Sequence, residues 1–199
     1  MVAEGSYHHG NLRAALLERA EEVLAQSGVV GLSLRGLARD LGVSHAAPTR
    51  HFRDRQAVLD ALVISGFTDL NERMRAVADA PEPVEARLTE LGRAYVRFAL
   101  DRSALLEQMF AAKHEGEPTE ELRGLSHESL ETAARLIAEA QRDGVVGPGD
   151  PVRLAQVAFS TVHGLTVLAV GGMLDDTPVE EAAELALEVL MNGLRAQRR

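Results

Sequence analysis

The stretch from residue 33 to residue 55, SLRGLARDLGVSHAAPTRHFRDR, restricts the possible folds of this chain more than any other part of the sequence. Leu34, Leu37 and Leu41 recur at the spacing that places side chains on one face of a helix. Ser33 stands directly before this face, and a serine hydroxyl there accepts a hydrogen bond from a free amide of the first helical turn. The pattern therefore predicts a short helix that begins after Ser33.

The sequence also marks the end of this helix and the start of the next. Gly42 follows the apolar face, and glycine readily adopts the left-handed backbone that closes a helix. Ser44 is a good cap for a second helix from His45 to Arg55, in which Pro48 lies in the first turn and makes the start irregular. Two helices three residues apart predict a helix-turn-helix, whose second helix enters the major groove of DNA.

The predicted second helix carries many hydrogen-bond donors. Hydroxyl, imidazole and guanidinium groups donate to phosphate oxygens and guanine edges, and small side chains let the backbone approach the bases. We expect His45 and Ala46 to face bases and Arg50 to reach bases or phosphates. Phosphate contacts are also expected from Ser33, Arg35, Thr49 and Arg55. Ser44 and His51 complete the candidate DNA-binding set.

Several short motifs follow one another within this stretch and directly after it. The chain reads Gly42-Val43-Ser44, then Thr49-Arg50-His51-Phe52, then Arg55-Gln56. This order resembles that of the TetR/AcrR family of transcriptional regulators. Ala47-Pro48 and the later Val162-His163-Gly164 are similar to a subgroup whose C-terminal domain is named for a Trp-His-Gly motif. The resemblance implies a dimer that reads an inverted-repeat operator in double-stranded DNA, and a second domain that binds a small effector.

The acidic charge of the chain is concentrated after this stretch. The chain has 199 residues, a formal net charge of −9 and no cysteine, which excludes disulfides and thiolate metal sites. Residues 1–60 hold seven arginines and seven acidic residues, whereas residues 61–199 hold 14 basic and 23 acidic residues. We therefore expect DNA contact at the N-terminal end only, with a strong dependence on salt. The lack of cysteine and of an apolar segment after Met1 favours a cytoplasmic protein.

Helical periodicity continues through the rest of the chain, without a strand pattern or an internal repeat. We expect an all-α fold of about nine helices, with a three-helix helix-turn-helix DNA-binding domain over residues 1–55. A helical effector-binding and dimerisation domain follows over residues 56–199. Its long linking helix, 56–80, would carry movement between the domains, with Gly66 as a flexing point or a close-packing position. Further helices are expected at 84–100, 104–114, 120–142, 152–174 and 179–196.

The last two predicted helices are apolar over more than one stripe. The surplus apolar surface predicts a homodimer in which two helices from each copy meet. The expected interface residues are Val157, Ser160, Gly164, Leu168, Leu187, Leu190 and Leu194. The run Leu154–Leu174 has no charged residue and is long enough to cross a bilayer, but its polar residues and glycines favour a buried helix and no membrane partner.

For the unknown, small and mostly apolar effector that the resemblance implies, the expected contacts are Phe67, Tyr95, Phe98, Met109, Phe110, Leu130 and His163. His163 is either a buried imidazole bonded to a neighbouring group or a polar handle in an apolar pocket.

Other chemistry has little support in the sequence. His114 and His127, with the glutamates near them, fit no metal-ligand spacing, and no catalytic or nucleotide-binding motif occurs. We therefore expect no metal, no cofactor and no enzymatic activity. The leading hypothesis is a dimeric, ligand-responsive transcriptional repressor. The alternative is an all-α carrier or helical-bundle enzyme without DNA binding, which binding to random DNA at low salt would distinguish.

Overall fold

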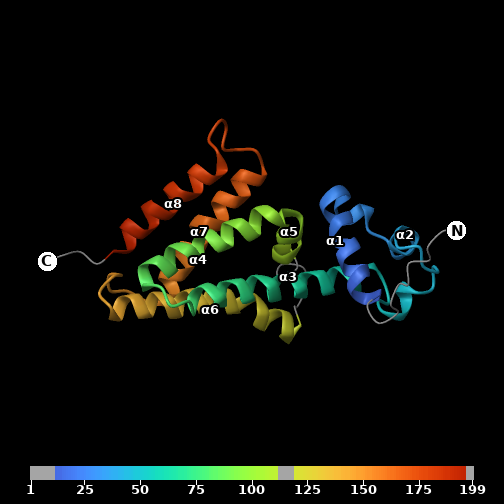
Figure 1. Ribbon diagram of the computed structural model, residues 1–199, viewed down its shortest axis with the longest axis horizontal. Coiled ribbons are helices and arrows are strands. Elements are labelled where there is room, and N and C mark those ends of the chain that lie inside the picture. Colours follow the sequence, from blue (N-terminus) through green and yellow to red (C-terminus); the bar gives the residue numbers. More distant parts are fainter. Residues whose placement is uncertain (1–11, 112–118, 196–199) are drawn as a thin grey trace. The chain divides into compact units, whose positions relative to one another are not determined.

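The computed structural model describes residues 12–111 and 119–195, which form eight α-helices and one 3-10 helix (Figure 1). The elements are α1 (Leu12–Gly31), α2 (Leu34–Asp40), η1 (Pro48–Arg50), α3 (Arg55–Ala78), α4 (Val84–Asp101), α5 (Ser103–Ala111), α6 (Glu120–Arg142), α7 (Pro151–Val170) and α8 (Val179–Leu194). Within this part of the chain, β pairing is limited to one isolated bridge between Val146 and Arg195. The prediction of an all-α fold with about nine helices is confirmed.

The described residues divide into two compact units. The first contains residues 12–66 and 104–111, and the second contains residues 67–103 and 119–195. The predicted domain boundary after residue 55 stays a prediction. The expected end of a helix at His114, and the loop after it, lie outside the described residues.

Apolar side chains of α1 and α2 form the core of the helix-turn-helix. Leu16 and Leu24 of α1 and Leu37 of α2 are buried, as the spacing of these residues requires. Phe52 is also buried, and the guanidinium of Arg13 lies 5.3 Å from the centre of its ring. The three-helix unit is therefore held together by the residues that the apolar pattern selects.

The linking helix α3 begins with a cap from Asp54, whose Oδ1 accepts a hydrogen bond from the amide of Ala57 at 2.8 Å. Gly66 lies where α3 packs on α5. A Cβ atom at Gly66 would lie 2.7 Å from Sδ of Met109 and 3.1 Å from Cδ2 of Leu105, both of which are buried. The structure therefore supports close packing at Gly66 rather than a flexing point.

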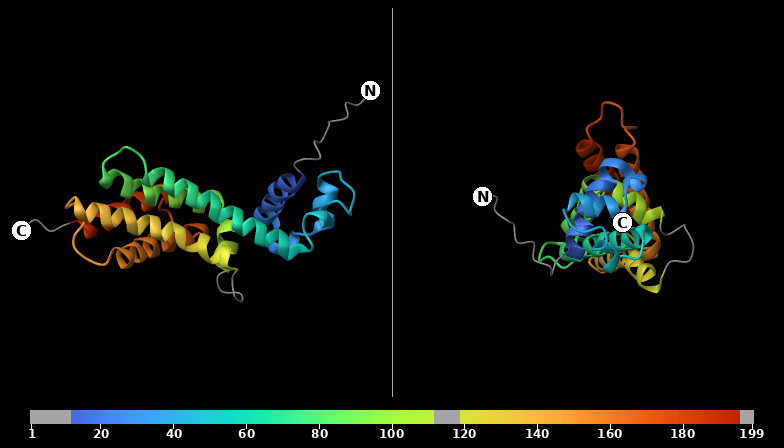
Figure 2. Two further views of the ribbon diagram at one scale, coloured as in Figure 1. Left: turned by 90° about the horizontal axis from the view of Figure 1, so that it is seen from below. Right: turned by 90° about the vertical axis from the view of Figure 1, so that its right-hand side faces the viewer.

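The second unit is built from α4, α6, α7 and α8 with the second half of α3 beside α6 (Figure 2). Thr119 caps α6, because its hydroxyl accepts from the amide of Leu122 at 3.2 Å. Asp150 caps α7 in the same way, at 2.9 Å from the amide of Val152. Arg93 of α4 donates two bonds of 2.6 Å to Glu184 of α8, so an exposed ion pair links the two helices.

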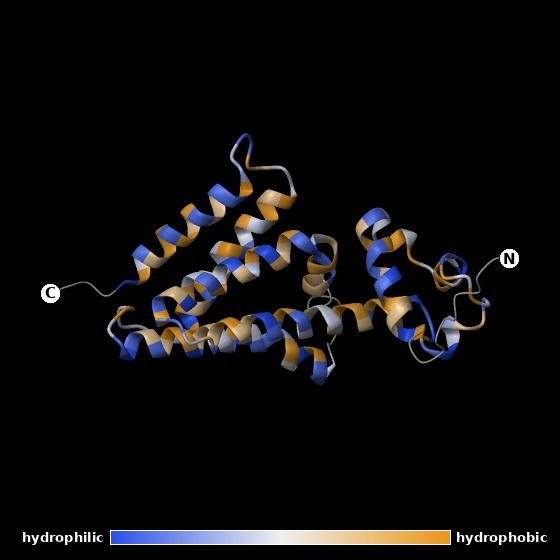
Figure 3. Ribbon diagram, viewed as in Figure 1, coloured by the Kyte–Doolittle hydropathy of each residue, from blue (hydrophilic) through white to orange (hydrophobic). Residues whose placement is uncertain are grey.

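Helix α7 is buried less than expected. By length and composition, it is long and apolar enough to cross a membrane. Only 17% of its 18-residue apolar window is buried inside the protein. Only Ala155, Val162 and Thr166 of α7 are fully buried. The expected buried helix is thus buried on one face, because α4, α6 and α8 pack against it and leave the rest of its surface uncovered. Figure 3 shows hydrophobic residues along both α7 and α8.

Candidate functional site

The first half of the site is α2, whose start is fixed by Ser33. The Ser33 hydroxyl accepts a hydrogen bond from the amide of Gly36 at 3.1 Å, so the predicted cap is confirmed. Gly42 has φ of 66°, and the amide of Val43 bonds to the carbonyl of Ala38 at 3.0 Å, which closes the helix. This short, closed helix buries Leu37 and exposes Arg35 and Arg39 on its outer face.

The second half of the site is shorter than predicted. No α-helix runs from His45 to Arg55; residues 45–47 form a turn and Pro48–Arg50 form the 3-10 helix η1. The physical reason is Pro48, which has no amide to donate to the carbonyl of Ser44, so the amide of Ala47 bonds to that carbonyl at 2.9 Å. We call residues 44–51 the recognition turn.

The recognition turn still presents the predicted donors to solvent. Pro48 is buried and anchors the turn. The Thr49 hydroxyl donates to the carbonyl of Ala46 at 2.9 Å, which holds the turn in shape. The exposed residues of the turn are Ser44, His45, Ala46, Thr49, Arg50 and His51.

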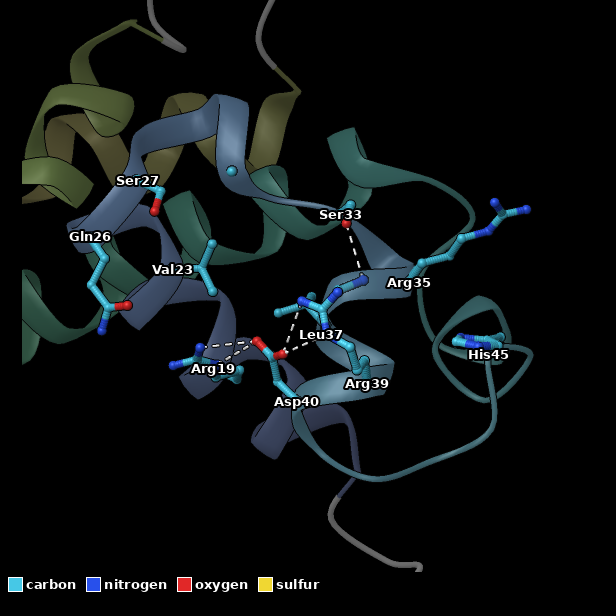
Figure 4. A pocket seen from close by; sticks show the side chains of 12 residues that line it. Arg19, Val23, Gln26, Ser27, Ser33, Arg35, Leu37, Arg39, Asp40 and His45 are labelled. Carbon is cyan, nitrogen blue, oxygen red and sulfur yellow. Dashed lines mark hydrogen bonds and ion pairs between the residues drawn. The ribbon is translucent and has the colours of Figure 1, made fainter.

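A hollow of about 370 Å³ lies between α1 and α2 and reaches His45 (Figure 4). In this hollow, Arg19 of α1 donates to Oδ2 of Asp40 at 3.0 and 3.1 Å, and Arg39 lies 3.3 Å from Oδ1 of the same carboxylate. The hydrogen bonds from Arg19 hold the pKa of Asp40 below its ordinary value. Arg35 points away from this cluster, as Figure 4 shows. The acidic group of the hollow is thus neutralised by its neighbours.

Three arginines of the helix-turn-helix region and the start of α3 are not engaged by any acidic group that the structure describes. Among the described residues, Arg35, Arg50 and Arg55 form no ion pair and are exposed, so their guanidinium groups are available to phosphates. Arg39 lines the hollow four residues after Arg35 but was not among the predicted contacts. Its position one helical turn away, on the same helix, is the signal that would have found it. The assignment of individual residues to bases or phosphates stays a prediction.

A second cluster lies inside the second unit. The hydroxyl of Tyr95 on α4 lies 2.8 Å from Nδ1 of His163 on α7. Phe159, one helical turn before His163, stacks on its ring at 5.2 Å and meets Tyr95 edge to face at 5.5 Å. Tyr95 is buried, and this burial raises the pKa of its hydroxyl. The structure brings Tyr95 and His163 together as a polar pair within aromatic surroundings; Phe159 was missed, although its spacing to His163 indicates a shared face.

The other expected ligand contacts are distributed between the units. Phe67, Phe98 and Leu130 belong to the second unit, where Phe67 and Phe98 are buried. Met109 and Phe110 belong to the first unit through α5, and Met109 is buried. Their roles in ligand binding stay predictions.

The expected interface residues fall into two groups. Val157 and Leu168 of α7 are 58% and 43% exposed, and Ser160 is exposed beside them. Leu187 and Leu194 of α8 are instead buried within their own subunit, whereas Gly164 and Leu190 are half-buried. The exposed apolar residues of α8 are Leu185 and Val189, at 59% and 63%. The sequence shows an amphipathic helix here but not which stripe faces α4.

Taken together, a capped helix-turn-helix with exposed donors, followed by a helical unit, defines a DNA-binding regulator. Residues 16–62 match the family described as bacterial regulatory proteins, tetR family, and residues 88–191 match the family described as tetracyclin repressor-like, C-terminal domain. The chain belongs to the TetR family of transcriptional regulators and is a ligand-responsive, DNA-binding member of it.

The chain is also similar to individual proteins. The chain is 22% identical to an uncharacterized HTH-type transcriptional regulator, YobS, from Bacillus subtilis (strain 168), over 93% of both chains. A solved structure of a protein with unknown function from Rhodococcus sp. RHA1 is 50% identical, with a TM-score of 0.87 over 98% of this chain and 100% of that chain. A TetR-family transcriptional regulator from Pectobacterium atrosepticum is 25% identical, with a TM-score of 0.74 over 98% and 100% of the two chains. The two matches that are described as transcriptional regulators favour the regulator over the carrier.

Proposed function

We propose that the protein binds an inverted-repeat operator in duplex DNA as a homodimer, and that it represses transcription until a small, mostly apolar effector binds its second unit. The protein acts by binding rather than by catalysis, needs no cofactor and works in the cytoplasm.

The DNA-binding part of the proposal is carried by one observation, namely which charged groups of the first unit are paired and which are not. Three exposed arginines, Arg35, Arg50 and Arg55, have no carboxylate partner among the described residues, whereas Asp40 is held by Arg19. Because phosphate neutralisation supplies most of the affinity for DNA, a unit of zero formal charge binds DNA only if its acids are engaged elsewhere. In the first unit, Glu22 and Asp40 are paired with Arg19, and Asp54 is paired with Arg53 and caps α3.

The homodimer is supported by the apolar residues that α7 and α8 leave uncovered. Val157 and Leu168 on α7, with Leu185 and Val189 on α8, are all more than two-fifths exposed. A pair of such helices meeting its symmetry mate buries this surface. A dimer of this kind presents two recognition turns, and half-sites of an operator lie about 34 Å apart on one face of DNA.

The effector site is supported by the Tyr95–His163 pair. Tyr95 and His163 offer a hydroxyl and an imidazole beside the ring of Phe159, a combination that fits a mostly apolar molecule with one polar group. An effector acts only through its preference for one arrangement of the protein over another. Release of the operator therefore requires an effector that binds the DNA-free arrangement more tightly.

The direct test is Arg50→Ala, with Arg142→Ala as a matched control that removes one exposed arginine from the end of α6. Duplexes selected from a random pool supply the operator, and fluorescence anisotropy at several salt concentrations supplies the affinity. For each half-site, we expect Arg50→Ala to weaken binding by about 1–3 kcal/mol if it contacts a base, or to lower the salt slope by about 0.9 if it contacts a phosphate, and the dimer loses both contacts. Arg142→Ala should bind as the wild type does.

An Arg50→Ala variant that folds, dimerises and retains wild-type affinity and salt slope would contradict the proposed site. A selection that returns no inverted repeat would contradict the proposed dimeric reading of DNA.

A further inference from the structure

A polar side chain is buried in the middle of the apolar stripe of α3. Asn71 is 1% exposed, and the residues that share its face, Phe67, Leu70, Met74 and Ala78, are also buried. A side-chain amide is buried in a protein interior only where hydrogen bonds within the protein replace those lost to water. The partners of Asn71 therefore determine what it does.

All side-chain hydrogen bonds of Asn71 go to one turn of α6. Nδ2 donates to the carbonyl oxygen of Leu125 at 2.9 Å and to Oε2 of Glu128 at 3.1 Å, and Oδ1 accepts from the hydroxyl of Ser129. Arg75, one turn further along α3, lies 3.0 Å from Oε1 of the same Glu128. We call Asn71, Arg75, Leu125, Glu128 and Ser129 the Asn71 clasp.

The partners of Asn71 have other groups to bond to. If a leucine replaced Asn71, its partners would keep other bonds: Glu128 is 34% exposed and paired with Arg75, and the Ser129 hydroxyl can bond within its own helix. The Leu125 carbonyl would retain its bond within α6. Replacing a buried polar group by an apolar one of similar volume is often neutral or stabilising when no partner is left unsatisfied.

The hydrogen bonds of Asn71 restrict the position of α3 along α6. Apolar contacts are non-directional and by themselves discriminate weakly between neighbouring positions of two helices, whereas three hydrogen bonds from one amide are satisfied at a single position. The clasp thus permits one register between the two helices. A buried asparagine that selects one register among several is a known device of paired helices.

We propose that Asn71 is a positioning residue that fixes the register of the linking helix α3 against α6, and that DNA binding depends on this register. Helix α3 is continuous from Arg55, which follows the recognition turn, to Ala78. A slip of its second half along α6 therefore changes where the first unit is held. The expected effect on DNA binding rests on the proposed function, whereas the register between α3 and α6 does not.

The register can be measured directly because the chain has no cysteine. Spin labels at Ala76→Cys on α3 and Glu131→Cys on α6, both exposed positions in the second unit, report the distance between the helices by pulsed electron paramagnetic resonance. An excess of unlabelled protein keeps labelled chains apart in any dimer. The variant is Asn71→Leu, and the matched control is Met74→Leu, which changes a neighbouring buried residue without touching the clasp.

We expect a narrow distance distribution for the wild type and for Met74→Leu. Asn71→Leu should keep its melting temperature while its distribution broadens or gains a second distance, with a slip of at most one helical turn, about 5.4 Å. Its affinity for the selected duplex should fall by about three- to tenfold. Ser129→Ala removes one bond of the clasp and should broaden the distribution less.

An Asn71→Leu distribution that matches the wild type would overturn the proposal. So would an Asn71→Leu protein that fails to fold, together with a Ser129→Ala protein whose distances are unchanged, because Asn71 would then supply stability and not register. If the distances change but the wild type binds no DNA, the register stands and the proposed function fails.

Discussion

At the scale of single residues, the first unit uses ion pairs and caps to control which charges face solvent. Asp54 caps α3 and also lies 3.1 Å from Nε of Arg53. Asp40 is bonded to Arg19, whose Nη1 also donates to Glu22 at 2.6 Å. Each of these carboxylates is occupied within the protein, so the arginines without such partners dominate the surface offered to DNA.

The same ion pairs predict how stability depends on pH. Arg19 lowers the folded-state pKa of Asp40, and Arg87 lowers that of Glu139. A carboxylate with a lowered folded pKa stabilises the protein above its unfolded pKa and loses this contribution as pH falls through the folded pKa. We expect Asp40→Asn and Glu139→Gln each to unfold at lower denaturant concentration than the wild type at neutral pH.

The differences between these variants and the wild type should shrink toward zero in strong acid. Chemical denaturation between neutral pH and about pH 2, below the ordinary carboxylate pKa values, measures them. A variant whose deficit stays constant over this range would show that its ion pair is not the source of the effect.

At the scale of elements, α3 is held differently along its length. Its first part packs on α5 through Gly66, where van der Waals contact is close, and its second part is tied to α6 through the Asn71 clasp. Asp69 is also bonded to Arg102 at the end of α4, at 2.6 Å. The sequence pattern of α3 shows a long amphipathic helix, but these attachments depend on residues far away in the chain.

The packing at Gly66 gives a stability prediction. Gly66→Ala should destabilise the protein by about 1–3 kcal/mol, because the new methyl group meets the buried side chains of Met109 and Leu105. Gly124→Ala is the matched control, since Gly124 is a helical glycine of α6 with nothing within 4 Å of its Cβ position. It should stabilise by about 0.5–1 kcal/mol. Thermal and urea unfolding compare the two, and a stabilised Gly66→Ala would favour flexing over packing.

At the scale of the whole molecule, charge and apolar surface are segregated along the chain. Residues 61–199 carry the whole net charge of −9, and the exposed large apolar residues of α7 and α8 also lie in this part. An acidic second unit repels DNA, which favours contact through the first unit alone. The uncovered apolar residues favour association with a second copy.

Association can be tested on α8. Leu185→Glu and Val189→Glu each place a carboxylate in the proposed interface, which costs on the order of 3 kcal/mol, or about a hundredfold in the dissociation constant. We expect light scattering after size-exclusion chromatography to show monomers for both. Glu188→Gln, at an exposed position between them, should remain a dimer. Dimers that persist in both glutamate variants would place the interface elsewhere.

The amino-acid sequence alone determined the local features of this protein. Helix bounds such as Glu120–Arg142, the Ser33 cap, the closure at Gly42 and the exposed donors of residues 44–51 follow from spacing and from backbone preferences of single residues. The sequence predicted that Pro48 makes the start of the second helix irregular. It did not predict that the second helix is reduced to the 3-10 helix η1.

Only the tertiary structure decided which groups meet across long stretches of chain. Tyr95 and His163 are 68 residues apart, and Asn71 and Ser129 are 58 apart. Periodicity gives the faces of a helix but not their neighbours, so it did not show that Leu187 and Leu194 are buried while Leu185 and Val189 are exposed. The physical reason is that hydrogen-bond partners and buried stripes are selected by packing between elements, which no local preference encodes.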